Sequence, residues 1–458
     1  MTSRRLVPVL ALAVAGTLGV PAAPASAGES DQVNARAVDK PAGASVGTQG
    51  VAASLATGIS SGAYAFAALR PTTRLNPAVF RAAMLRALTG AAGSAYLGKR
   101  MSGMVMDVNT GQVLWAHYSY QARIPASTQK VMTAFTVLRS MNANQQLVTK
   151  ASVSNANRAN VYLTGAGDPS FTLTRLKSLA LRSATALRAR GARTVNIYVD
   201  DRIFPAPSAT PGWKASYLKS DVQLVRGLTL AGYRGSDGAA AAGKYFARYL
   251  TAYKVRATYR GRAATPRSTT KLADSWSASV RSMVRTMLAY SVNDYAEYLL
   301  RHAARAQGKW PTPKATIANQ YAKLAGAGIS VSGYRAYDGS GLSRSNRMPA
   351  RTLAETVRAL YTKASDREVA FAWSGMPRAG QTGTLSSRFR VKTQVCARGR
   401  VIAKTGTLND VVSLAGIAQG TDGRDRAFVL LENGLTKAAS VRLAMDQLAT
   451  AVVGCRLG

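Results

Sequence analysis

The chain has 458 residues, which is enough for a sizeable core and for two or three domains. Its hydrophobic content of 47% and charged content of 18% are typical of a globular protein. Lys and Arg number 60 against 21 Asp and Glu, so the net charge of +39 favours anionic partners over cationic ones. Nucleic acid, an anionic envelope polymer and a membrane surface all fit that charge, as does a basic surface that only faces solvent.

The N-terminus has the three parts of a secretory signal peptide. A basic start, "MTSRR", precedes the apolar stretch "LVPVLALAVAGTLGV", and "APASA" ends at Ala27 in an A-x-A-like cleavage site. A retained N-terminal anchor is the alternative, although the apolar stretch is short for a membrane span. We expect residues 1–27 to be removed and the protein to be exported, to the cell wall or as a secreted protein. Export, and the lack of a zinc-finger or RNA-binding signature, argue against nucleic acid as a partner.

The predicted elements begin after a linker. Residues 28–72 are rich in Gly, Ala and Ser without apolar periodicity and predict a flexible segment. "NPAVFRAAMLRALTG" predicts a helix that Asn76 caps and Gly90 closes, with Pro77 in its first turn. In residues 101–119, apolar and polar residues alternate on both sides of "NTG", which predicts a hairpin. The apolar run "VMTAFTVL" after "STQK" predicts the next helix.

The pattern changes at about residue 151. Residues 151–271 contain no Glu, and 20 Lys and Arg against five Asp give them a net charge of +15. Residues 172–200 predict a helix, a Gly stop and a strand, as in one unit of an inserted domain. Residues 275–305 predict two helices broken at "SVND", and residues 400–453 predict a strand, a hairpin and a closing helix. Strands at both ends of the chain with helices between them favour one α/β domain interrupted by an insertion.

Cysteine and histidine are scarce. Cys396 and Cys455 are the two cysteines, and in an oxidising compartment such a pair predicts one disulfide, with two buried free thiols as the alternative. They are too few and too far apart in sequence for a metal site. A Ser-His-Asp triad would have to use His117 or His302, and both stand in patterns typical of surface or packing residues.

Ser127 and Lys130, in "STQK", are the first candidate catalytic pair. A serine hydroxyl is a poor nucleophile until a base takes its proton, and a lysine can be that base only when burial or another cation lowers its pKa. Residues three apart share a helix face, so Lys130 can reach the Ser127 hydroxyl. The alternative is that Ser127 is an ordinary helix cap. "SYLK", residues 216–219, has the same spacing but no amphipathic helix behind it, so we interpret it as a chance match.

Two further motifs make the first one more specific. "SVN" falls at a helix junction, where a turn can direct Ser291 and Asn293 into a cleft. "KTG" ends an apolar strand, where Lys404 supplies a cation and Gly406 permits close approach of a ligand. The partial copies "SMN" and "QTGTL" are interpreted as structural, because the first lies too close to Ser127 in sequence and the second lacks the lysine. All three motifs in this order are far more specific than any one alone.

With these motifs the sequence resembles the serine penicillin-binding proteins and serine β-lactamases. More closely it resembles the D-alanyl-D-alanine carboxypeptidase/endopeptidases of the low-molecular-weight class C type, peptidase family S13. That likeness runs from about residue 75 to the end, is weak over residues 222–272, and rests on "GAGDPSFT", "PGW", "YDGSGLSRSNRM", "GMPRAGQTGTLSSRF" and "AKTGTLNDVVSLAG". It implies an α/β (α+β) fold of the β-lactamase and transpeptidase type, a sheet flanked by helices. We expect the catalytic domain in residues 73–150 and 273–458 and the insertion in residues 151–272.

The resemblance also implies a role for each motif residue. Ser127 attacks the carbonyl of the penultimate D-Ala of a peptidoglycan stem peptide, with Lys130 as base. Ser291 relays the proton to the leaving amine, and Asn293 bonds the substrate's peptide group. Lys404 and Thr405 would bind the substrate's terminal carboxylate, and Gly406 would also contact the substrate. The backbone N–H groups of Ser127 and Thr407 would form the oxyanion hole.

Other expectations from the resemblance concern the substrate, the partners and the cysteines. Arg344 would meet an acidic group on the stem-peptide side chain, with a plain surface arginine as the alternative. Asp168 would meet a substrate amine, unless "GDP" is simply a turn. β-Lactams would be covalent inhibitors, anionic wall polymers or the membrane surface would bind by charge, and no metal or cofactor is implied. In this fold the closing helix packs on the sheet of "RVIAKTG", which would let Cys396 and Cys455 approach.

Three rival functions share some of these features. A serine β-lactamase has the same motifs but usually no such insertion, and it hydrolyses the penicillin acyl-enzyme quickly. An esterase of the same superfamily also fits the motifs. A non-catalytic, basic wall-binding protein fits the charge, but the intact Ser127, Lys130 and Lys404 argue against it.

Overall fold

The computed structural model describes residues 77–93, 96–98, 101–435 and 437–455. The predicted signal peptide, linker and Asn76 cap lie outside them. Its first sheet is antiparallel, in the order β10-β11-β12-β1-β2. The strands come from both ends of the chain: β1 (Ser102–Asp107), β2 (Val113–His117), β10 (Val401–Leu408), β11 (Val411–Gln419) and β12 (Asp425–Asn433).

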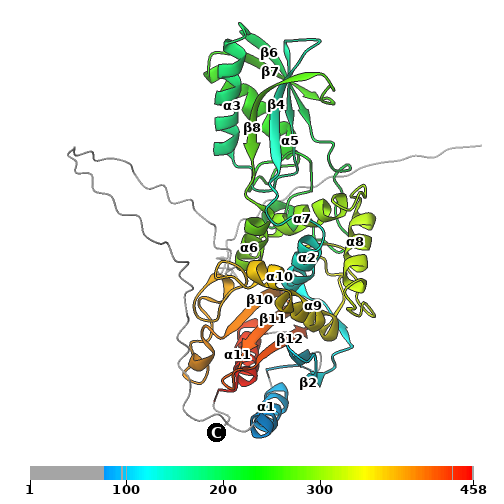
Figure 1. The fold of residues 1–458 in the computed structure, drawn as a ribbon, viewed down its shortest axis with the longest axis vertical. Coiled ribbons are helices and arrows are strands. Elements are labelled where there is room, and N and C mark those ends of the chain that lie inside the picture. Colours follow the sequence, from blue (N-terminus) through cyan, green and yellow to red (C-terminus); the bar gives the residue numbers. More distant parts are fainter. Residues whose placement is uncertain (1–76, 94–95, 99–100, 436, 456–458) are drawn as a thin grey trace, which may run out of the picture. The chain divides into compact units, whose positions relative to one another are not determined.

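Helices cover both faces of this sheet. On one face α9 (Ala350–Thr362) contacts β1, β11 and β12, and shares its apolar core with α2 (Gln129–Leu138) and α6 (Val280–Tyr290). On the other face α11 (Ala438–Val453) packs on β11 and β12, and α1 (Pro77–Ala92) packs on α11. Figure 1 shows the sheet between these two layers. The central strands are therefore buried on both faces, which explains their continuous apolar runs.

Shorter elements complete this part of the fold around α2. Further helices are α7 (Asn293–Arg305), α8 (Pro313–Ala325) and α10 (Ala364–Ala370). A two-stranded pair joins β3 (Ala122–Arg123) to β9 (Met348–Pro349), and the 3-10 turns are η1 (Ala126–Thr128), η2 (Gly383–Leu385) and η3 (Val395–Ala397).

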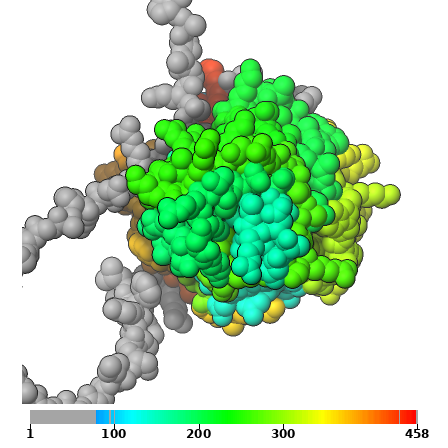
Figure 2. Space-filling model, turned by 90° about the horizontal axis from the view of Figure 1, so that it is seen from above, coloured from blue at the N-terminus to red at the C-terminus, as the bar shows by residue number. Residues whose placement is uncertain are grey.

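A second five-stranded sheet has the order β7-β6-β5-β4-β8 and its own apolar core. Its elements are β4 (Val148–Ser154), β5 (Asn160–Thr164), α3 (Leu173–Arg188), β6 (Thr194–Asp200), α4 (Tyr217–Ser220), α5 (Gly238–Ala252), β7 (Arg256–Arg262) and β8 (Thr269–Trp276). Seen from above, the cyan and green residues of this part fill most of the visible face (Figure 2). The division of the chain at residues 151 and 272 stays a prediction, and the sheet itself begins at Val148 and ends at Trp276.

Most predicted elements are confirmed, and one helix end is not. The hairpin over residues 101–119 is β1 paired with β2, and the Asp107 carboxylate accepts a bond from the Thr110 amide in its turn. The helix, Gly stop and strand of residues 172–200 are α3, Gly191 and β6. The prediction that Gly90 closes the first helix is wrong, because α1 continues to Ala92. Space around Gly90 is open and its backbone is not left-handed, so nothing there stops the helix.

The closing helix brings the two cysteines together. Cys396 in η3 and Cys455 after α11 are joined by a disulfide, with their Cα atoms 6.1 Å apart. No helix in the described part of the chain is long and apolar enough to cross a membrane.

Candidate active site

The Ser127 motif lies where η1 runs into α2. Ala126, directly before the serine, has a φ of 47°, which is unusual for a residue with a side chain and marks a strained turn. Ser127 is half-buried at the tip of this turn, whereas Lys130 on the first turn of α2 is fully buried. The Lys130 Nζ donates to the Ser127 Oγ at 3.0 Å, so the predicted pair is in hydrogen-bond contact.

Lys130 is surrounded by acceptors. Besides Ser127, its Nζ donates to the Oδ1 of Asn293 at 2.7 Å and to the main-chain oxygen of Ser340 at 2.7 Å. Burial lowers the pKa of Lys130 to about 7, although nearby carboxylates, that of Asp338 first, act in the opposite direction. A lysine with such a pKa is a free amine in much of the protein at neutral pH, which is the form that can accept a proton from serine.

The second motif occupies the predicted helix junction. α6 ends at Tyr290, its C-cap Ser291 adopts a left-handed backbone with φ of 61°, and α7 begins at Asn293. This turn reverses the chain and places Asn293 against Lys130. The Asn293 Nδ2 donates to the main-chain oxygen of Asp221 at 3.0 Å. The Ser291 hydroxyl has no hydrogen-bond partner among the described residues, so it is available to a ligand.

The third motif stands on β10. Lys404 is fully buried, and its Nζ donates to the main-chain oxygen of Thr405 at 2.7 Å. Burial and then the positive charge of Lys130 lower the pKa of Lys404 well below its usual value. The two lysines therefore face one site. The Thr405 hydroxyl is 2.7 Å from that of Thr384, which belongs to the "QTGTL" copy, so that copy lines the edge of the strand rather than being remote from it.

Gly406 lets β10 approach the serine turn. A Cβ on Gly406 would stand 2.9 Å from both the Ser127 amide nitrogen and the Pro125 oxygen, and would collide with the Ser413 hydroxyl. Ser413 on β11 in turn donates to the Pro125 oxygen at 2.7 Å. The amide of Ser127 is thus held beside β10, on which Thr407 lies exposed. An oxyanion hole requires two amides side by side, and the pairing of the Ser127 amide with that of Thr407 stays a prediction.

The loop of residues 338–344, within the "YDGSGLSRSNRM" stretch that carries the resemblance, completes the surroundings of Lys130. Ser340 supplies an acceptor to Lys130, and the Oε1 of Glu297 accepts from the amides of Gly339 and Ser340 at 3.0 and 2.7 Å. Asp338 accepts the amide of Gly341 at 3.0 Å. The sequence did carry a signal for Glu297 at the site. It follows Asn293 by four residues, which puts both side chains on one helix face. The main-chain oxygen of Ser340 has no signal in the sequence.

The second sheet's part of the chain also reaches this site. The indole N–H of Trp213 donates to Asp338 at 2.8 Å, and the oxygen of Gly212 accepts the Arg344 amide at 3.1 Å. Together with the bond from Asn293 to Asp221, these contacts place residues 211–223 beside the motifs. The "SYLK" copy belongs to this segment, but Ser216 is exposed and makes no contact with the motif residues.

Arg344 forms an ion pair across the site's rim. Its Nη2 is 2.8 Å from the Oδ2 of Asp410, which lies in the turn between β10 and β11. Both side chains are partly exposed, so the pair is accessible to a ligand. A contact between Arg344 and an acidic group of the substrate stays a prediction.

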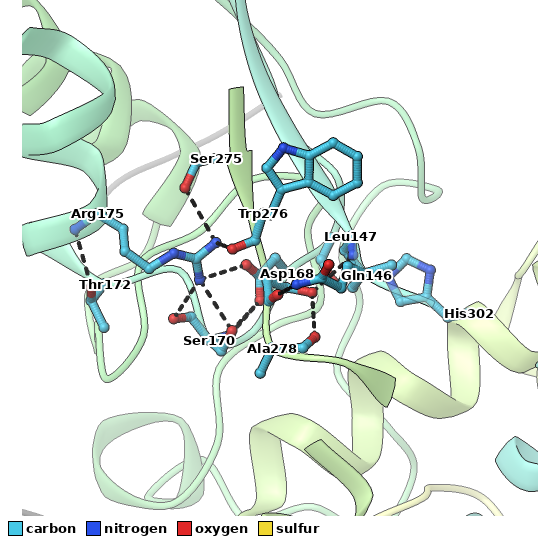
Figure 3. Close-up of polar contacts among 12 residues, drawn as sticks. Gln146, Leu147, Asp168, Ser170, Thr172, Arg175, Ser275, Trp276, Ala278 and His302 are labelled. Carbon is cyan, nitrogen blue, oxygen red and sulfur yellow. Dashed lines mark hydrogen bonds and ion pairs between the residues drawn. The ribbon is translucent and has the colours of Figure 1, made fainter. Parts of the chain in front are cut away.

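Asp168 lies in a different environment (Figure 3). Its carboxylate is buried, accepts from the amide and hydroxyl of Ser170 at 2.8 and 2.6 Å, and pairs with Arg175 at 2.9 Å. Arg175 also donates to the oxygen of Trp276, which ties α3 to β8. These are the contacts of a turn and an ion pair, the alternative that the sequence left open. A role for Asp168 toward a substrate amine stays a prediction.

The histidines do not join the motifs. His302 is fully buried on α7 with its Nε2 2.9 Å from the oxygen of Gly167, and burial lowers its pKa to about 4. His117 lies at the end of β2 and stacks on Trp115. Both are packing residues, as predicted. In chemical terms the site offers a serine paired with a buried amine, a second hydroxyl and a second amine, which suits acyl transfer through an acyl-enzyme.

Comparisons with known proteins point to the same chemistry. The model of the D-Ala-D-Ala carboxypeptidase 3 (S13) family matches residues 86–223 and 227–452. The chain is 30% identical over 405 residues to carboxypeptidase DacB of Mycolicibacterium smegmatis, which covers 83% of this chain and 86% of that one. Penicillin binding protein 4 (dacB) from Haemophilus influenzae has a similar structure, with a TM-score of 0.66 and 20% identity over 80% of this chain and 98% of that one. The same protein complexed with a β-lactam gives a TM-score of 0.63, again at 20% identity over 80% and 98%. The predicted fold class is confirmed.

Proposed function

The chain belongs to the D-Ala-D-Ala carboxypeptidase 3 (S13) family, a family of serine D-Ala-D-Ala carboxypeptidase/endopeptidases, and on that premise we propose that Ser127 is its nucleophile. The observation that carries the proposal is the 3.0 Å contact between the Ser127 hydroxyl and the buried Lys130 amine. No other described serine combines a half-buried hydroxyl with a lysine whose pKa burial lowers to about 7. The substrate is a peptidoglycan stem peptide that ends in D-Ala-D-Ala.

The reaction proceeds through an acyl-enzyme. The Ser127 oxygen attacks the carbonyl carbon of the penultimate D-Ala while Lys130 takes the hydroxyl proton. The amides of Ser127 and Thr407 bind the oxyanion of the tetrahedral intermediate, which lowers the activation barrier by several kcal/mol. When the C–N bond breaks, the proton passes through the Ser291 hydroxyl to the departing D-Ala amine. Water then attacks the ester, and Ser127 recovers its proton.

Substrate binding uses the remaining motif residues. Lys404 and Thr405 bind the terminal carboxylate, and Asn293 binds the peptide group next to the scissile bond. Burial lowers the pKa of Lys404 well below its usual value, and a carboxylate placed beside it would raise that pKa again. A terminal carboxylate beside Lys404 therefore favours the protonated form of this lysine. This coupling favours an anionic C-terminus over an amidated one.

β-Lactams fit the same site as covalent inhibitors. The related Haemophilus influenzae protein has been solved in complex with a β-lactam. Attack by Ser127 on the lactam carbonyl would open the ring and leave an ester on the serine. In this case the amine remains tethered to the acyl group, so it keeps water from the ester and the adduct persists.

The substrate lies outside the cytoplasmic membrane, so the family implies extracytoplasmic action. We further infer that residues 1–27 direct export and that residues 151–272 form an inserted domain. The net charge of +39 then holds the mature protein to anionic wall polymers or to the membrane surface.

Two assays on the mature protein test the proposed function. The first measures D-Ala release from a stem pentapeptide, and the second measures the lifetime of the adduct with a labelled penicillin. D-Ala release together with a long-lived adduct is the expected result. Rapid turnover of penicillin without D-Ala release would indicate a β-lactamase instead, and absence of any adduct would indicate a non-catalytic protein.

A further inference from the structure

A buried carboxylate lies one helical turn beyond Asn293. Glu297 follows Asn293 by four residues on α7, so both side chains lie on one face. Asn293 contacts Lys130 directly at 2.7 Å. Glu297 contacts Lys130 only indirectly, through the Ser340 loop. Its Oε1 accepts hydrogen bonds from the amides of Gly339 and Ser340 at 3.0 and 2.7 Å. α7 therefore has both a direct and an indirect contact with the base.

The link from Glu297 to Lys130 runs through the Ser340 loop. The Ser340 oxygen accepts from the Lys130 Nζ at 2.7 Å. The amide of the same peptide unit, that of Gly341, donates to Asp338 at 3.0 Å. Thr133, on α2, donates to the Gly339 oxygen at 2.7 Å. The acceptor of Lys130 is thus held on one side by Glu297 and on the other by Asp338.

Glu297 differs from the other carboxylates that face Lys130. Asp294 forms an ion pair with Arg234 at 3.0 Å. Asp338 accepts hydrogen bonds from five groups, namely those of Trp213, Ser340, Gly341, Ser343 and Asn346. Glu297 is 5% exposed and has no ion pair among the described residues. It is therefore the carboxylate near Lys130 with the least compensation for its charge.

Glu297 also changes its charge in the range where Lys130 does. Burial, and then the charge of Asp338, raise the pKa of Glu297 to about 7, while hydrogen bonds from Ser340 and the charge of Arg301 act in the opposite direction. Burial lowers the pKa of Lys130 to about 7, and the charges of Asp338, Glu297 and Asp294 oppose that shift. Lys404 on β10 also faces Lys130, whose charge lowers the pKa of Lys404. When two ionisable groups interact and titrate in the same pH range, the apparent pKa values belong to the pair and not to either residue.

We propose that Glu297 is a positioning residue, which fixes the Ser340 loop against Lys130 and whose buried charge sets the pH range in which Lys130 serves as base. The proposal rests on the role of Lys130 in the proposed function. A negative Glu297 favours the protonated form of Lys130, so the wild-type acid limb of acylation contains two coupled ionisations. Without that charge, Lys130 loses its proton at lower pH and in a single step.

Glu297→Gln separates charge from geometry, because the amide oxygen of glutamine can still accept both loop amides. The measurement is the second-order rate of penicillin acylation from pH 5 to pH 9. We expect the acid limb of Glu297→Gln to move to lower pH and to fit one ionisation. Glu432→Gln is the matched control, since burial also raises the pKa of Glu432 to about 7 but this residue does not face Lys130. An acid limb of unchanged midpoint and shape in Glu297→Gln would overturn the proposal.

Glu297→Ala tests the positioning part. Alanine leaves the amides of Gly339 and Ser340 without their buried acceptor, so the loop should no longer hold the Ser340 oxygen against Lys130. At pH 9 we expect acylation by Glu297→Ala to be at least about tenfold slower than by Glu297→Gln. Equal rates for the two variants at pH 9 would show that the loop needs no support from Glu297.

A measurement that needs no Glu297 variant covers the case in which these proteins do not fold. The chain has five Glu residues, so carboxyl ¹³C spectra of Glu-labelled protein are simple, and the Glu297 signal can be assigned by substituting the other four. Coupling between titrating groups is reciprocal. The Glu297 signal should therefore titrate at higher pH in Lys130→Met than in the wild type, and an identical midpoint would contradict the proposal. Failure of wild-type protein to form any penicillin adduct would instead count against the proposed function.

Discussion

Gly406 on β10 lies against the backbone of Ser127, so close that a methyl group on Gly406 would stand 2.9 Å from the Ser127 amide nitrogen. The strand that carries Lys404 and the turn that carries the serine are therefore in direct contact. This contact fixes the distance between Lys404, the proposed terminal-carboxylate site, and Ser127, the proposed nucleophile.

Gly406→Ala should push the strand away from the serine turn. The added Cβ has no free space, because the Pro125 oxygen, the Ser127 amide and the Ser413 hydroxyl surround it. We expect penicillin acylation to fall by at least about tenfold, since small displacements of reacting groups are costly. Gly90→Ala is the control, because Gly90 has open space around it, and it should acylate like the wild type. A Gly406→Ala protein with wild-type acylation would mean that the contact is unimportant.

Lys130→Met should make the protein inactive and, in a pH-dependent way, more stable. The pKa of Lys130 is about 7 in the folded state and near 10.5 in an unfolded chain. Between these values the unfolded state binds more protons, so wild-type stability rises as the pH rises through this window. The melting temperature of Lys130→Met minus that of the wild type should therefore be greatest at pH 6, and this difference should decline toward pH 10. A difference that is constant with pH would show that Lys130 is not buried as described.

Arg344→Ala should change substrate selection rather than acylation. The pair with Asp410 is partly exposed and contributes at most about 1 kcal/mol to stability, so the variant should fold. We expect D-Ala release to fall for a stem peptide whose diamino acid carries a free carboxylate, and to change little for the amidated peptide. Penicillin acylation, which needs no such contact, should be unaffected. Equal losses on both peptides would argue against a contact with an acidic group.

The Cys396–Cys455 bond should contribute to stability and not to catalysis. It closes a loop with a sequence separation of 59 residues, which the chain-entropy estimate values at about 4 kcal/mol. The exported, mature protein should lack alkylatable thiols until it is reduced, as mass spectrometry can establish. Reduction should lower the melting temperature while penicillin acylation persists below it. Two free thiols in native protein would contradict this prediction.

The sequence was most informative where chemistry depends on neighbours along the chain. The three residues between Ser127 and Lys130 set a shared helix face, and "KTG" and "SVN" fall at element ends that apolar patterns locate. These features sufficed for the family and the fold class, and both are confirmed. The prediction at Gly90 was wrong because its backbone does not turn left-handed, the conformation in which a glycine commonly ends a helix.

Other parts of the site depend on contacts across more than 100 residues, which the sequence does not reveal. Lys130 and the Ser340 oxygen are 210 residues apart, and a main-chain acceptor has no side-chain identity to recognise. The Asp221 oxygen, which accepts from Asn293 across 72 residues, is also a main-chain acceptor without a signal in the sequence. Asp168 shows the reverse case, because its partners Ser170 and Arg175 are near neighbours in sequence, as the turn alternative for "GDP" implied.

The identity of the nucleophile is tested most directly by mapping the penicillin adduct. A helix cap would tolerate Asn in place of Ser127, because asparagine accepts the same amide bond, whereas a nucleophile would not. Peptide mass spectrometry of wild type, Ser127→Asn and the decoy variant Ser216→Ala, with circular dichroism to establish folding, separates the two roles. We expect one adduct on Ser127 in the wild type and in Ser216→Ala, and none in folded Ser127→Asn. An adduct on Ser216, or full acylation of folded Ser127→Asn, would contradict it.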